Sequence, residues 1–73
     1  MDFKQLRALL TVAETGNVTR AAEVLHLVQP AVSRQLMLLE QDIGTPLFER
    51  ERHGMVLTDA GRSLVGYARR AML

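Results

Sequence analysis

The segment RAAEVLHLVQPAVSRQLMLLE, residues 20–40, sets two helical patterns end to end, with a proline just past their junction. Proline fits the first turn of a helix, because the N–H group that it lacks has no partner there. We therefore expect the second of these helices to begin near Gln29 and Pro30 and to run to about Ile43. In a chain of 73 residues, the two helices have no room for a long linker between them.

The helix predicted from Gln29 has two chemically different sides. Four apolar residues stack on one side at helical spacing: Val32, Leu36, Leu39 and Ile43. Five residues fan across the other side: Pro30, Ser33, Arg34, Met37 and Gln41. A helix wrapped by apolar neighbours does not need this polar set, whereas a helix that offers one face to another molecule does.

Two helical patterns precede residue 29, and the second of them continues into the segment described above. Asp2 is a good N-cap, and Gln5 completes a capping-box pair ahead of apolar residues at helical spacing. Gly16 supplies the left-handed stop of this helix, and Asn17 caps the next one. The apolar residues of the first helix are Phe3, Leu6, Leu9, Leu10 and Ala13, and those of the second are Val18, Ala21, Ala22 and Leu25.

Residues 47–57 predict a β-hairpin. The segment LFERER, residues 47–52, alternates, and His53-Gly54 then turns the chain into the apolar residues 55–57. A side-chain period of two places Arg50 and Arg52 on the same side of the first strand, at the end nearest the turn.

A last amphipathic helix begins at Thr58 and Asp59. Its apolar residues include Leu64, Val65, Ala68, Met72 and Leu73. Three helices, a two-stranded hairpin and a final helix, in this order, describe a mainly α fold, the winged helix-turn-helix. In this fold the hairpin is the wing and the third helix is the presented element. We expect residues 1–57 to form this domain and residues 58–73 to form the helix that follows it.

Composition narrows the possible classes of function. The chain has no cysteine, which removes disulfides, thiolate zinc sites and cysteine nucleophiles. No apolar run approaches the roughly 20 residues that span a bilayer, so we expect a soluble, cytoplasmic protein without membrane contact. No phosphate loop or Ser-His-Asp arrangement is visible. Glu23 and His26 match only part of a di-iron pattern. We therefore expect no enzyme, no metal site and no cofactor.

The presented face of the third helix suits duplex DNA. A net charge of +1 is too small to indicate nucleic-acid binding by itself, so the placement of polar residues matters more. Gln29 can form two hydrogen bonds with adenine, and Ser33 can bond a base edge or a phosphate. Arg34 can donate a bidentate pair of hydrogen bonds to guanine or phosphate. All three lie in the N-terminal half, which a helix-turn-helix inserts into the major groove. Each alone is an ordinary solvated residue, but together on one face they favour DNA.

The hairpin allows two interpretations. Arg50 and Arg52 next to its tip suit contact with phosphate or insertion into a narrow minor groove. Glu49 and Glu51 favour the alternative, in which the acidic and basic side chains pair along a solvated strand. The sequence alone does not decide between them.

Several motifs resemble the N-terminal DNA-binding domain of the LysR-type bacterial transcriptional regulators. They are TRAA, QPAVSRQ, LE, GxxLFER and LTxAG, and the resemblance covers nearly the whole chain. It implies that DNA contacts come from Thr19, Gln29, Pro30, Ser33, Arg34, Arg50 and Arg52. It also implies that the helix from Thr58 begins a dimerising linker, and that a C-terminal domain beyond this chain senses a small-molecule effector.

One residue departs from the family's pattern. The family usually has Ser or Thr before Gln-Pro, whereas this chain has Val28, so the hydroxyl that would cap the third helix or touch phosphate is missing. The fold itself is expected to be unaffected.

The sequence leaves two further alternatives. Leu64, Val65, Ala68 and Met72 are expected to pair with a second copy of the chain, but Leu64 and Val65 could instead fold back on the first helix. A winged helix can also serve as a protein-interaction module, because a fold alone does not determine function.

Overall fold

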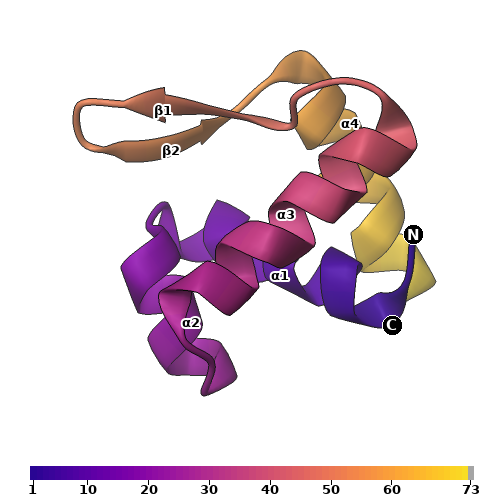
Figure 1. Cartoon of the computed structure of the whole chain (residues 1–73). Coiled ribbons are helices and arrows are strands. Elements are labelled where there is room, and N and C mark those ends of the chain that lie inside the picture. Colours follow the sequence, from indigo (N-terminus) through magenta and orange to yellow (C-terminus); the bar gives the residue numbers. More distant parts are fainter. Residues whose placement is uncertain (73) are drawn as a thin grey trace.

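The computed structural model describes residues 1–72, and Leu73 lies outside the described residues. The elements are α1 (Phe3–Thr15), α2 (Val18–Leu25), α3 (Gln29–Ile43), β1 (Phe48–Glu51), β2 (Gly54–Leu57) and α4 (Asp59–Ala71). The two strands form one antiparallel hairpin, in which Phe48 pairs with Leu57 and Glu51 pairs with Gly54. This order confirms the predicted mainly α, winged helix-turn-helix fold (Figure 1). The boundary predicted at residues 57 and 58 stays a prediction.

Helix α1 begins and ends at the residues that the sequence predicted, and α2 begins at its predicted cap. Asp2 and Gln5 form a complete capping box at the start of α1, and Gly16 ends that helix with φ 69°. The Asn17 side chain accepts a hydrogen bond from the backbone N–H of Arg20 and so caps α2. Together these residues fix the conformation of the turn between α1 and α2, which forms a corner.

The start of α3 is different, because its N-cap residue makes no hydrogen bond through its side chain. That residue is Val28, and Pro30 occupies the first turn of the helix as predicted. At its other end, α3 stops at Gly44, which has φ 86°. The N-terminal end of α3 is therefore set by proline and by packing rather than by a side-chain cap.

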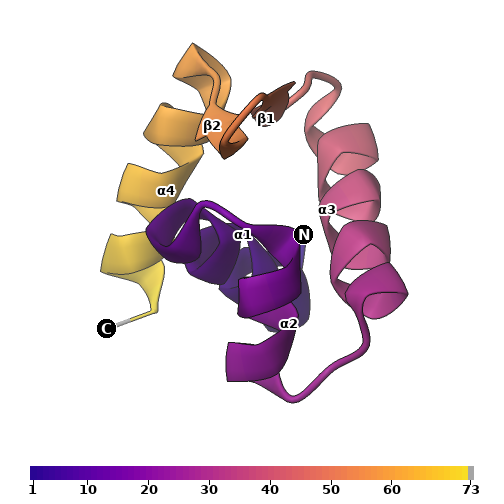
Figure 2. The ribbon, with the colours of Figure 1, turned by 90° about the vertical axis from the view of Figure 1, so that its left-hand side faces the viewer.

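Helix α1 lies at the centre of the domain, and α2, α3 and α4 all contact it. Figure 2 shows α4 on one side of α1 and α3 on the other. The largest fully buried side chains are Leu9, Leu39, Leu47, Val12 and Val32. The core therefore joins α1 to α3 and to the base of the hairpin, which positions both of the elements expected to meet DNA.

The structure corrects one residue of the predicted apolar side of α3. Val32, Leu36 and Leu39 are buried as expected, but Ile43 is 41% exposed. Ile43 lies in the last turn of the helix, next to Gly44, where α3 extends beyond the core. Helical periodicity therefore predicted correctly that Ile43 lies on the same side of α3 as the buried residues. It did not predict that the core does not cover this side as far as Ile43.

The hairpin also differs from its predicted form. Strand β1 ends at Glu51, so Arg52 and His53 form the two-residue turn and Gly54 belongs to β2. Arg52 therefore does not share a strand face with Arg50, as the sequence had suggested. The displacement follows from a close contact, because the backbone N–H of Met55 donates to the carbonyl of Gly16 at 2.9 Å.

Candidate nucleic-acid interface

The base of the wing is fixed to α3 by one carboxylate. Glu40 accepts hydrogen bonds from the backbone N–H groups of Leu47 at 2.8 Å and Phe48 at 3.4 Å. Both groups precede or begin β1, which leaves α3 through the turn at residues 44–46. Because hydrogen bonds to a charged acceptor are stronger than neutral ones, Glu40 sets the direction in which the hairpin leaves α3.

The far part of the hairpin is held to the corner between α1 and α2. Besides the hydrogen bond from Met55 to Gly16, Gly54 has φ 138°, and a Cβ atom there would lie 2.2 Å from the Gly16 carbonyl oxygen. Only glycine allows this approach of two backbones. The wing is therefore attached at both ends, and its turn is positioned beside the start of α2.

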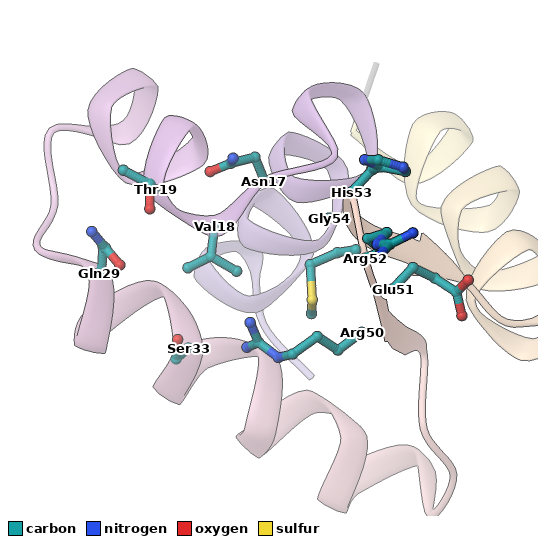
Figure 3. A pocket seen from close by; sticks show the side chains of 11 residues that line it. Asn17, Val18, Thr19, Gln29, Ser33, Arg50, Glu51, Arg52, His53 and Gly54 are labelled. Atoms are coloured by element: carbon teal, nitrogen blue, oxygen red, sulfur yellow. The ribbon is translucent and has the colours of Figure 1, made fainter.

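These contacts enclose a hollow of about 430 Å³, which we call the wing cleft. Its walls come from the start of α2, from one side of α3 and from the hairpin (Figure 3). The lining residues are Asn17, Val18, Thr19, Gln29, Ser33, Arg50, Glu51, Arg52, His53, Gly54 and Met55. Three segments that are distant in sequence thus present polar side chains to one space.

The wing cleft brings together five of the residues singled out from the sequence: Thr19, Gln29, Ser33, Arg50 and Arg52. In Figure 3, the Arg50 side chain extends from the hairpin toward α3, on the side where Ser33 lies. Pro30 lines a neighbouring groove, and Arg34 is exposed on α3 next to Ser33. The set predicted as a DNA-binding face is therefore contiguous.

Positive charge dominates the wing cleft. Arg50 and Arg52 line it together with a single acidic residue, Glu51, which points away from α3 in Figure 3. Two ion pairs are found among residues 1–72, Met1 with Asp42 and Arg62 with Asp59. Neither involves the hairpin, so the alternative in which its acidic and basic residues pair along the strand is not observed.

The N-terminus of α2 adds a further preference for anions. Asn17 caps this helix, so the first N–H groups of α2 and the positive end of its dipole lie at the wall of the wing cleft. From the sequence, Asn17 was expected only to cap a helix and His53 only to form part of the hairpin turn, but both line the wing cleft. The sequence nevertheless contained a signal for this anion preference, because an N-cap at Asn17 marks the start of a helix beside Thr19.

The structure assigns two of the expected dimer residues to the core of the chain. Val65 is 5% exposed and Ala68 is 0% exposed, because α4 packs against α1. They therefore do not face a second copy, and for Val65 the alternative of folding back on the first helix holds. Leu64 and Met72 are half-buried against the same core.

None of the helices formed by residues 1–72 has the length and apolar character needed to cross a membrane. Within the same residues, no three side chains of His, Asp or Glu lie close enough together to hold a metal ion. Glu23 and His26 do not belong to any such group.

Comparison with known proteins gives a consistent result. Residues 3–62 match the family model described as "Bacterial regulatory helix-turn-helix protein, lysR family". The chain is 49% identical over 72 residues to the HTH-type transcriptional regulator ClcR of Pseudomonas putida, and 51% identical over 69 residues to the RuBisCO operon transcriptional regulator of Allochromatium vinosum. These matches cover 99% and 94% of this chain, but only 24% and 23% of the relatives. The chain thus spans about a quarter of their length.

Solved structures of DNA complexes are also similar to this chain. One is the complex of the CbnR DNA-binding domain with DNA, with a TM-score of 0.94 and 44% identity over 99% of this chain and 83% of that one. Another is the BenM DNA-binding domain with its catB site 1 DNA, with a TM-score of 0.94 and 33% identity over 99% of this chain and 81% of that one.

Proposed function

Because the chain belongs to the lysR family of bacterial regulatory helix-turn-helix proteins, we propose that it is the duplex-DNA-binding part of a transcriptional regulator. In this proposal the N-terminal half of α3 enters the major groove, and Gln29, Ser33 and Arg34 meet base edges or phosphates there. The wing lies along the sugar-phosphate backbone or over the adjacent minor groove. Bacterial DNA lies in the cytoplasm, which is where such a regulator would work.

The observation that carries this proposal is the wing cleft. Its two arginines and the start of α2 offer positive charge and N–H donors at the edge of the same face on which α3 presents its polar residues. A duplex seated on α3 would bring phosphates to these groups on either side of the groove. A DNA backbone therefore complements both the shape and the charge of this face.

The function is tested by selecting bound duplexes from a random pool and then measuring affinity at several salt concentrations. We expect an enriched sequence, and an affinity whose logarithm falls linearly with the logarithm of the salt concentration. The double variant Arg50→Ala with Arg52→Ala should make this dependence shallower. Arg69→Ala with Arg70→Ala is the matched control, since it removes the same charge from exposed positions on α4.

The alternative function is a protein-interaction module that uses the same helical face. It predicts that no duplex sequence is enriched and that duplex binding is weak. It also predicts that the control double variant and the hairpin double variant change this binding equally. Equal effects of the two double variants would therefore refute the DNA-binding role of the wing cleft.

We further propose that the chain acts as a homodimer through α4. This helix lies on the opposite side of α1 from α3 (Figure 2), so a second copy could pair with it without covering the DNA-binding face. Tyr67 is 48% exposed and Ala71 is also exposed, one helical turn further on. A two-fold dimer of this kind would place two α3 helices in major grooves roughly 34–36 Å apart, or a multiple of that distance.

Sedimentation equilibrium tests the dimer. Tyr67→Glu with Ala71→Glu should give a folded monomer with weaker DNA binding, because both positions are exposed within one chain. If the unmodified chain is a monomer at high micromolar concentration, α4 alone does not make the dimer. In the full-length regulator, a C-terminal effector-binding domain would adjust transcription in response to a small molecule.

A further inference from the structure

The N-cap of α3 is occupied by a residue that local structure does not favour. Val28 is 70% exposed, and its side chain makes no capping hydrogen bond. Ser, Thr, Asp or Asn would accept a hydrogen bond from the first turn, which valine cannot do. Val28 contributes little to the core for the same reason, since most of its side chain remains in solvent. A residue that breaks a local rule without an internal compensation is expected at functional positions.

Val28 lies on the face proposed to meet DNA. A groove between α2 and α3 is lined by Val28 together with Thr19, Gln29, Pro30 and Ser33. Thr19, Gln29 and Ser33 also line the wing cleft, so the groove and the cleft are parts of one continuous surface. Val28 is at the N-terminal end of α3, the end that leads into the major groove in the proposed arrangement.

On this basis, and resting on the proposed DNA-binding function, we propose that Val28 reads a thymine through the 5-methyl group of that base. The edges of the base pairs in the major groove carry hydrogen-bond donors and acceptors, and the thymine methyl is the apolar group among them. An exposed valine at the tip of the recognition helix matches this group and no other on the groove floor. Cytosine lacks the methyl, so Val28 would discriminate between the two pyrimidines.

Substituting uracil for thymine tests this contact, because it removes the methyl group and leaves the pairing edge unchanged. Each thymine of the selected duplex is replaced in turn, and the affinity of the 73-residue chain is measured. We expect one position in each half-site at which uracil weakens binding about fourfold, the factor that corresponds to about 0.8 kcal/mol for one buried methyl group.

The variant Val28→Ser should bind the uracil and thymine duplexes almost equally at that position. Serine is a better N-cap than valine, so a loss of discrimination would not reflect unfolding. Val24→Ser is the matched control, since Val24 is also exposed but lines a different hollow, beside Lys4 and Arg7. This control should keep the full uracil effect.

Two results would overturn the inference while leaving the proposed function intact. One is a selected duplex at which no uracil replacement weakens binding. The other is a uracil effect of equal size in the unmodified chain and in Val28→Ser, which would assign the methyl contact to another residue such as Pro30. A chain that selects no duplex sequence at all would refute the proposed function, and this inference with it.

Discussion

Replacing Gly61 by alanine tests how α4 is held against the base of the wing. Gly61 is a buried residue in the first turn of α4, and a Cβ atom there would lie 2.1 Å from the carbonyl oxygen of Leu47. The same atom would lie 3.0 Å from the Leu47 carbonyl carbon and 2.8 Å from Cδ2 of Leu57. Two of these three obstacles are backbone atoms, which cannot move aside as a side chain does.

The expected loss follows from two opposing terms. In an unobstructed helix, alanine is more stable than glycine by about 0.5–1 kcal/mol. Overpacking of a close contact costs about 1–3 kcal/mol, and the upper end applies because the Leu47 carbonyl also accepts a hydrogen bond from the N–H of Thr58. Gly61→Ala should therefore lower the free energy of unfolding by about 2 kcal/mol, and the melting temperature of so small a domain by roughly 8–16 °C.

Thermal unfolding followed by circular dichroism measures this loss, and Gly66→Ala is its matched control. Gly66 lies in the same helix, and a Cβ atom there would meet only the Arg70 side chain at 3.6 Å, an ordinary contact. Gly66→Ala should therefore raise the melting temperature. If Gly61→Ala raises it as well, the close approach of α4 to the wing is not as tight as the structure describes.

Three further substitutions test the interface and the start of α3. Arg34→Ala should cost about 1–3 kcal/mol on the selected duplex and much less on random duplex, whereas equal losses on both would leave Arg34 only a phosphate contact. Arg52→Ala should lower the slope of log affinity against log salt by about one on every sequence, and an unchanged slope would rule out that contact. Val28→Ser should stabilise the chain by about 0.5–2 kcal/mol, because so little of Val28 is buried that its loss does not offset the new cap. A lower unfolding midpoint in urea would contradict that expectation.

Local signals in the sequence predicted the helices well, because helix ends depend on neighbouring residues. Asp2 with Gln5, Gly16 and Asn17 act within a few residues of the backbone groups that they satisfy. The polar side of α3 was also predictable, since helical periodicity separates polar from apolar residues before any tertiary contact is known. Whether each polar residue meets DNA stays a prediction.

The form of the hairpin was less predictable, because a contact distant in sequence sets it. The alternation of residues 47–52 suggested a strand that included Arg52, and the turn was expected one residue too late. The position of the turn depends on Gly54, which must approach Gly16 so closely that no other residue fits. Gly16 and Gly54 lie 38 positions apart in the sequence, and no local pattern connects them.

The sequence was equally unable to show whether the apolar side of α4 packs within the chain or against a second copy. A stripe of Leu64, Val65, Ala68 and Met72 fits packing on the same chain as well as packing on a second copy, because the two surfaces are chemically alike. The two kinds of packing are distinguished by how close α4 lies to α1. Ala68 is completely buried in the core, and α4 contacts α1. A dimer through α4 must therefore use the opposite side of the helix, around Tyr67, which helical periodicity alone would have assigned to solvent.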